Sequence, residues 1–151
     1  AVVALITDIV TGRPCGLHRT YLKSDGSGKV EDQPDKAMLG RFKGGVVRLC
    51  PDEEVTQGLG ISEGIETGLS VMSWGWRPVW AALSTSGLSV FPVLAGIQSL
   101  TIFADHDDNG AGQKAARQCA ERWADTGREA IIRTPRKPGD WNDVLQEVKN
   151  G

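Results

Sequence analysis

From residue 58 onward, apolar strand-like runs such as "GLGIS" and "LTIFA" alternate with segments whose apolar residues recur at helical spacing. Strands joined by helices run parallel, because a helical crossover returns the chain to the same end of the sheet. The pattern therefore predicts an α/β fold: a parallel, Rossmann-like sheet of about four strands flanked by helices.

The elements of this part can be placed from the pattern alone. Strands are expected at 58–62, 79–83, 100–104 and 129–134. Helices are expected after the first strand, around 88–96, over 111–127 and over 142–148.

Residues 1–56 show a different pattern, in which short strand candidates are separated by turns. The runs "VVALITDI", "LHRTYL" and "GGVVRL" are typical of strands, and the Asp25-Gly26 pair in "KSDGSGK" is a hairpin-turn signal. The segment "PDEEVTQG" looks like a boundary. We therefore expect a small hairpin-rich β subdomain over 1–56 and a second domain over 57–151.

Composition is that of a globular protein, with 40% hydrophobic and 24% charged residues. No apolar run approaches the roughly 18 residues that a bilayer span needs. The three cysteines form no CxxC pair, so neither a zinc site nor a disulfide framework is indicated, and a reducing cytoplasm fits best. The chain does not begin with Met, and we expect it to be a piece of a longer protein.

Charge is unevenly distributed although the net charge is only −2. Residues 1–50 carry eight Lys or Arg against five Asp or Glu, whereas residues 51–151 carry nine against fourteen. A cationic arm beside an acidic pocket would suit a polyanion handled through metal ions.

Carboxylates follow the ends of the expected parallel strands. Glu63 follows the first strand, Asp105 and Asp107 follow the third, and Asp140 lies in the turn after the fourth. Ligands of parallel sheets bind at the carboxyl ends of the strands, so these acids converge if the first and third strands are neighbours. Oxygen ligands without a Cys or His pair favour Mg²⁺ or Mn²⁺ over zinc.

These acids also have interpretations that involve folding alone. Glu63 and Glu66 could stabilise a helix N-terminus through its dipole, by about 0.3–1 kcal/mol each. Asp108 or Asn109 could cap the next helix, and Asp143 is expected to be a helix N-cap. The tryptophans are expected to serve as core or as cover over the core.

Other motifs are incomplete. "GRFKGGV" lacks the second half of a phosphate-binding loop, and "GLGISEG" has the wrong glycine spacing for a dinucleotide fingerprint. His106 is expected to face outward and not to bind metal, because side chains alternate at a strand end.

Three segments taken together, "EGIETGLSV", "FADHDDNGAGQKAA" and "GDWNDVL", resemble the Toprim domain in their order and spacing. This module is shared by bacterial-type primases, topoisomerases and some nucleases. The resemblance covers about residues 57–148 and is strongest to phage- and plasmid-type primases, which are often fused to a helicase. The segment before it, with "HRTYL", "DGSGK" and "KAMLG", is similar to the region that precedes Toprim in those proteins.

The resemblance implies roles for individual residues. Glu63, Asp105 and Asp107 match the catalytic acids, and the same three with Asp140 match the ligands of Mg²⁺ or Mn²⁺. One departure is Thr67, which stands where bacterial replicative primases usually have an aspartate.

The implied activity is metal-dependent nucleotidyl transfer by the catalytic part of a DNA primase, which makes RNA primers from nucleoside triphosphates on single-stranded DNA. A zinc-binding domain, a helicase domain or both would be partners in the full-length protein. The cations expected to contact template or triphosphate are Arg19, Lys36, Arg41 and Lys43, with Arg136 and Lys137 as further candidates.

Four alternative functions differ in the residues that they require. A Toprim nuclease would use similar acids with water as the nucleophile, and a non-catalytic Toprim module would dock DNA or an assembly partner. A phospho-receiver module has its paired acids after the first strand, the reverse of the order here. A topoisomerase needs a tyrosine nucleophile, and the sole tyrosine, Tyr21, lies in the hairpin region.

Overall fold

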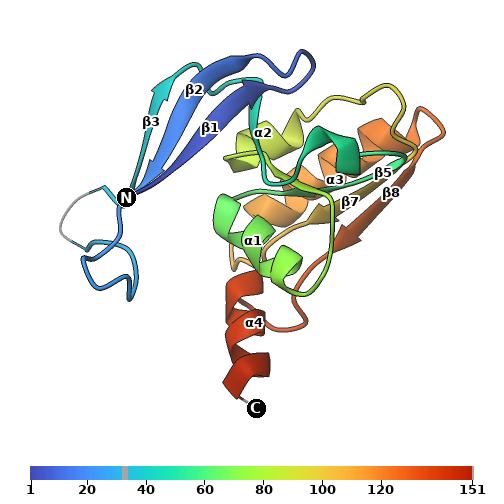
Figure 1. Cartoon of the computed structure of the whole chain (residues 1–151). Coiled ribbons are helices and arrows are strands. Elements are labelled where there is room, and N and C mark those ends of the chain that lie inside the picture. Colours follow the sequence, from blue (N-terminus) through green and yellow to red (C-terminus); the bar gives the residue numbers. More distant parts are fainter. Residues whose placement is uncertain (32–33, 151) are drawn as a thin grey trace.

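The computed structural model describes residues 1–31 and 34–150. Within them, eight strands form one sheet in the order β3-β2-β1-β4-β6-β5-β7-β8 (Figure 1). The strands are β1 (Val2–Asp8), β2 (Pro14–Thr20), β3 (Lys36–Gly40), β4 (Gly45–Arg48), β5 (Gly58–Ser62), β6 (Val79–Ala81), β7 (Ser99–Phe103) and β8 (Glu129–Arg133). The helices are α1 (Ile65–Ser73), α2 (Thr85–Ser89), α3 (Ala111–Ala124) and α4 (Trp141–Asn150), with a short 3-10 turn at Asp52–Glu54.

The second part of the chain forms the α/β fold that its sequence pattern predicts. β5, β6, β7 and β8 run parallel, with β5 between β6 and β7. α3 packs on β7 and β8 and against α2, while α1 packs on β5 and β6 and against α4 (Figure 1). Helices therefore cover both faces of the parallel sheet.

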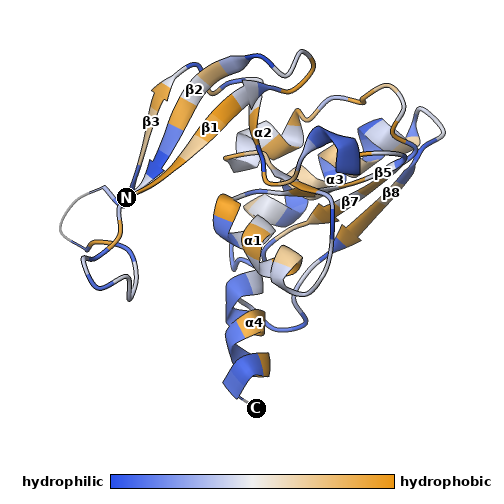
Figure 2. Cartoon of the chain, viewed as in Figure 1, coloured by the Kyte–Doolittle hydropathy of each residue, from blue (hydrophilic) through white to orange (hydrophobic). Residues whose placement is uncertain are grey.

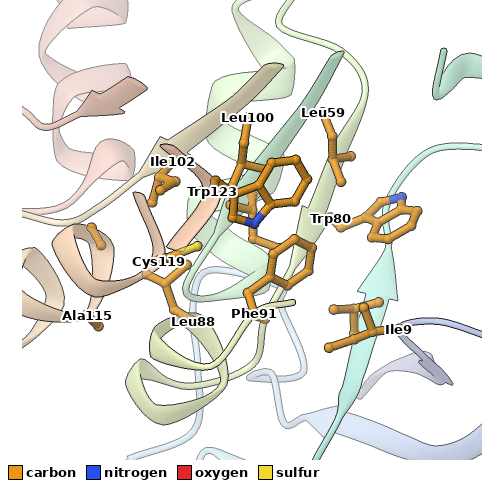
Figure 3. Close-up of a cluster of buried hydrophobic side chains, with 14 of the residues drawn as sticks. Ile9, Leu59, Trp80, Leu88, Phe91, Leu100, Ile102, Ala115, Cys119 and Trp123 are labelled. Atoms are coloured by element: carbon orange, nitrogen blue, oxygen red, sulfur yellow. The ribbon is translucent and has the colours of Figure 1, made fainter. Parts of the chain in front are cut away.

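The largest core lies between this sheet and the α2–α3 layer (Figure 3). Leu59 and Ile61 of β5 enter it, because alternate residues of a strand share one face. Phe91 and Trp123 stack within it with ring centres 6.2 Å apart. A smaller cluster around Phe103 packs under α1 on the other face.

The N-terminal strands extend the same sheet in antiparallel fashion. β1 pairs with β2, and β2 with β3. β4 pairs with both β1 and β6 and so joins the two parts of the chain. Figure 2 shows apolar segments along β1 to β3, which project away from the helices. The Asp25-Gly26 signal lies in a tight turn in which Gly26 has a φ of +73°.

Two elements differ from the sequence prediction. β3 was not expected, because its "KAMLG" sequence has no β-branched residue, and it forms by pairing with β2. The short helix α2 begins at Thr85, earlier than the expected 88–96. The Ser84 side chain accepts a hydrogen bond from the Gly87 amide at 3.0 Å and caps it, and Pro92 follows soon after.

Candidate active site

Glu63 and Asp105 follow two neighbouring strands of the parallel sheet. β5 and β7 pair directly, with Ser62 opposite Phe103, so the residues after them lie at one edge of the sheet. The strand adjacency on which the predicted acidic pocket depends is therefore confirmed.

Asp105 is half-buried and held by a hydroxyl. Thr67 Oγ1, on α1, donates to both carboxylate oxygens, at 3.1 Å to Oδ1 and 3.2 Å to Oδ2. Burial raises the pKa of Asp105 to about 6, and the charges of Asp140 and Glu63 add to the rise, although the Thr67 bond opposes it. The negative charge of Asp105 is thus poorly compensated, and a cation would favour its ionised form.

Asp107 lies at the N-terminus of α3. Its Oδ2 accepts a hydrogen bond from the Gly112 amide at 3.3 Å, in a position where the helix dipole favours negative charge. Its Oδ1 is buried and has no hydrogen-bond partner among the described residues. A buried carboxylate oxygen without a donor is costly, so this atom calls for a donor or a cation.

Glu63 is oriented by Thr85 at the start of α2. Thr85 Oγ1 donates to Glu63 Oε1 at 2.8 Å. A Cβ atom added at Gly112 would lie 3.4 Å from both Glu63 Oε2 and Asp107 Oδ2. These two oxygens therefore lie within twice that distance of each other, and the missing side chain at Gly112 leaves the space beside them open.

The loop between β8 and α4 brings Asp140 to the same place. The backbones of His106 and Gly139 exchange two hydrogen bonds of 2.9 Å, and His106 Nδ1 lies 3.2 Å from the Pro135 carbonyl oxygen. These contacts hold the loop against the end of β7. Asp140 consequently lies near enough to Asp105 for its charge to raise the pKa of that carboxyl.

Asp140 is also the N-cap of α4, where the sequence predicted Asp143, and that prediction was wrong. The Asp143 amide donates to Asp140 Oδ1 at 2.8 Å, and the Asp140 amide donates to Asp143 Oδ2 at 3.2 Å. This reciprocal pair is a capping box, in which the residue before the helix is the cap. The capping box engages Oδ1 of Asp140, and Asp140 also lines the acidic pocket.

Two lysines of the N-terminal part line this acidic pocket, a cavity of about 320 Å³. Lys29 Nζ lies 2.5 Å and Lys36 Nζ 3.6 Å from Glu66 Oε1. Burial raises the pKa of Glu66, but the bond from Lys29 and the charge of Lys36 outweigh burial and hold that pKa below its usual value. The residues that line the acidic pocket are Lys29, Lys36, Glu63, Gly64, Glu66, Thr67, Asp105, Asp140 and Asn142.

The other cations expected to bind nucleic acid lie elsewhere. Arg41 Nη2 is 2.7 Å from Asp8 Oδ2, and Lys43 lines a separate hollow beside α2. The Arg19 guanidinium lies 5.8 Å from the centre of the Tyr21 ring. Of the four predicted residues, Lys36 is the one that lines the acidic pocket within the described part of the chain.

Three residues of the site were not assigned roles from sequence. Lys29 lies in a segment whose sequence predicts a turn. Thr85 begins α2, a helix that was expected only from residue 88. Thr67 was noted only as a departure from the family pattern. Its position was a usable signal, because Thr67 follows Glu63 by four residues, the spacing at which the family pattern has an acid.

The donor set fits a hard divalent cation in chemistry, since all its atoms are carboxylate oxygens. Among residues 1–31 and 34–150, no three His, Cys, Asp or Glu side chains converge closely enough to hold a metal ion as they stand. Holding one would require Glu63, Asp105, Asp107 and Asp140 to draw together, and Asp107 Oδ1 would then gain the partner that it lacks among the described residues.

A family model for the Toprim domain matches residues 58–150, which include all four of these acids. The chain belongs to the Toprim domain family. Residues 1–49 match a second model, described as a domain of unknown function. No curated protein sequence matches the chain.

Solved primase structures share the fold of this Toprim chain. The zinc-binding and RNA polymerase domains of Aquifex aeolicus primase match with a TM-score of 0.67 and 19% identity, over 97% of this chain and 36% of that one. The DnaG catalytic core matches with a TM-score of 0.65 and 18% identity, over 97% and 48%. A DNA primase domain from Pseudomonas aeruginosa matches with a TM-score of 0.56 and 17% identity, over 95% and 52%.

At these identities the likeness shows the fold, which is that of primase catalytic cores. The Toprim chain spans about a third to a half of these longer chains. The narrower resemblance to phage- and plasmid-type primases stays a prediction. In the described part of the chain, every helix is too short or too polar to span a membrane.

Proposed function

We propose that this Toprim chain is the catalytic part of a DNA primase, which joins ribonucleotides into short RNA primers on a single-stranded DNA template. The observation that carries the proposal is that Glu63 and Asp105 follow the adjacent strands β5 and β7, with Asp107 Oδ1 buried and unpartnered among the described residues. The family match and the likeness to primase cores support it.

Glu63, Asp105, Asp107 and Asp140 would hold Mg²⁺ or Mn²⁺. When bound, such a cation would stabilise charge on the attacking and leaving oxygens of the phosphoryl group. The protein's part is to supply oxygen ligands from the ends of β5 and β7 and from the loop before α4. Because a nearby cation lowers the pKa of Asp105, binding would keep that carboxylate ionised at neutral pH.

Glu63 would have a second task, which is to take the proton of the attacking hydroxyl. Thr85 fixes Oε1, and Oε2 faces the open space at Gly112. In our proposal Oε2 accepts the proton from the 3′-hydroxyl of the growing primer. A base oriented in this way needs no large movement before transfer.

The cations would bind the polyanionic substrates. Lys29 and Lys36 already line the acidic pocket, where the triphosphate of an incoming nucleotide would compete with Glu66 for them. Arg19, Arg41 and Lys43 lie outside that pocket and would contact the DNA template. Because the matching primase chains are longer, a zinc-binding domain, a helicase domain or both are proposed partners in the full-length protein.

The test compares primer synthesis with magnesium-dependent DNA degradation, using the longest natural form of the protein. Asp105→Ala should abolish synthesis, while Asp108→Ala, an exposed carboxylate in the same loop, should retain it. Degradation without synthesis would instead support a Toprim nuclease. Neither activity, together with intact DNA binding, would support a non-catalytic docking module.

A further inference from the structure

A second hollow of about 340 Å³ adjoins the acidic pocket. It lies between the loop of residues 134–140, the first turns of α4 and Trp74 after the end of α1. Asp140 lines both this hollow and the acidic pocket, so the two are neighbours at that residue. Its volume lies within the range of natural small-ligand sites. We call it the aromatic hollow.

Indole rings give the aromatic hollow a rigid wall. Trp74 and Trp141 meet edge to face with ring centres 5.9 Å apart, and Trp141 meets Phe103 in the same way at 5.6 Å. The Trp141 indole N–H donates to the Ala104 carbonyl oxygen at 3.2 Å, which fixes that ring. Trp74 is nevertheless 45% exposed. The wall thus presents a supported aromatic ring to solvent.

Cations lie on the same lining. Lys137 Nζ is 3.3 Å from Glu147, and Asp143 is engaged in the cap of α4. Arg136 is exposed and makes no ion pair with any described carboxylate. The aromatic hollow therefore combines an open indole with an available guanidinium, a pairing that suits a base and its phosphate.

We propose that the aromatic hollow binds one unpaired nucleotide of a single-stranded nucleic acid, whose base stacks on Trp74 and whose phosphate meets Arg136. A strand whose phosphates lie near Asp140 would place a neighbouring base in the aromatic hollow, because the two cavities adjoin there. The inference rests on the proposed function for the identity of the strand, but binding itself requires no turnover.

The experiment measures the affinity of labelled oligonucleotides by fluorescence anisotropy, with one DNA arm and one RNA arm. Trp74→Leu should weaken binding about fivefold or more, the loss expected for one base stack, while Trp74→Phe should bind nearly as well as the unaltered chain. An oligonucleotide of abasic sites should bind the unaltered chain and Trp74→Leu equally. Arg136→Ala should reduce the salt slope by about 0.7.

Trp76→Leu is the matched control, since Trp76 is also exposed but does not line the aromatic hollow. If Trp74→Leu fails to fold, two measurements still test the proposal: the salt slope of Arg136→Ala, and the affinity of the unaltered chain for ordinary against abasic oligonucleotides. A preference for RNA would assign the site to the primer, and a preference for DNA to the template; both support the proposal.

Unchanged affinity in Trp74→Leu, or no oligonucleotide binding by the unaltered chain, would overturn the inference. Failure of the proposed function looks different. If Asp105→Ala leaves synthesis unchanged while binding still depends on Trp74, the primase assignment fails and the nucleotide site stands.

Discussion

The hydroxyl of Thr67 is shared between both carboxylate oxygens of Asp105, at 3.1 and 3.2 Å. Thr67 lies in the first turn of α1, four residues after Glu63, where the resemblance to replicative primases leads us to expect an aspartate. A carboxylate there would repel Asp105, whereas a hydroxyl donates to its ionised form. Compared with an aspartate at this position, Thr67 gives the acidic pocket one negative charge fewer and still orients Asp105.

Removal of this hydroxyl should weaken metal binding. Thr67→Val keeps the shape of the side chain but removes the hydroxyl that donates to Asp105, and we expect the affinity for Mn²⁺ to fall by about tenfold, as for other residues that orient metal ligands. Titration with Mn²⁺ followed by electron paramagnetic resonance measures this directly. Thr67→Ser restores the donor and should bind normally; equal affinity in all three proteins would show that Thr67 serves packing alone.

Asp105 should make the stability of the metal-free protein depend on pH. Its pKa is 3.8 ordinarily and about 6 in the folded chain, so between these values the folded state binds more protons than the unfolded state. Its contribution to the free energy of unfolding therefore falls as the pH rises through this window. Asp105→Asn should be more stable than the unaltered chain at pH 7, by on the order of 1–2 kcal/mol, and the gap should close near pH 4.

Urea unfolding in the presence of a chelator, at several pH values, measures this difference. The comparison between the two proteins is needed because burial lowers the pKa of His18, which acts in the opposite sense by favouring stability at higher pH. A gap that does not change with pH would contradict the raised pKa of Asp105.

Asp107→Asn should separate catalysis from stability. The buried Oδ1 gains nothing from its charge without a cation, so the melting temperature in metal-free buffer should stay equal or rise. Primer synthesis by the full-length protein should be lost. Asp108→Asn, in the same loop but exposed, should change neither quantity. A clear fall in melting temperature for Asp107→Asn would mark the residue as structural.

Lys36, one of the two lysines that line the acidic pocket, should matter for nucleotide binding. Lys36→Ala removes a cation 3.6 Å from Glu66, and we expect the KM for nucleoside triphosphates to rise several-fold with a smaller change in kcat. Lys43→Ala, outside the acidic pocket, is the matched control. Steady-state kinetics at fixed template concentration measures both, and equal KM values would place the triphosphate away from Lys36.

Reversal of two cations of the N-terminal part should weaken template binding. Arg41→Glu with Lys43→Glu should reduce affinity for single-stranded DNA across all sequences, since phosphate contacts position without specifying. Each lost contact should lower the salt slope by about 0.7. Arg41 also pairs with Asp8, so Asp8→Ala serves as a control for the loss of that ion pair. An unchanged salt slope would place the template path elsewhere.

Glu63 and Asp105 were predictable because each follows a strand whose own residues predict it. "GLGIS" matches β5 and "LTIFA" overlaps β7, so Glu63 and Asp105 fell at the ends of correctly placed strands. The parts that sequence did not predict depend on neighbours. β3 exists through its pairing with β2, and Lys29 approaches Glu66 because the chain folds back between distant segments.

The tryptophans illustrate the same limit. Trp80 and Trp123 are core residues, as expected of most tryptophans. Trp74 and Trp76 are partly exposed. The aromatic wall beside them forms because Trp141, at the start of α4, packs against Phe103, which also contacts Trp76. Hydropathy cannot distinguish these cases, because it describes a side chain without its surroundings.

β4 has a mechanical consequence. It is hydrogen-bonded to β1 on one side and β6 on the other, so the lysine-bearing and acid-bearing parts share one continuous sheet. The proposed division at residue 56 therefore cannot act as a hinge, because rotation there would break the pairing of Val47 with Ala81. Any widening of the gap between the cationic and acidic walls must therefore come from side chains, from the turn that carries Lys29, or from bending of the sheet itself.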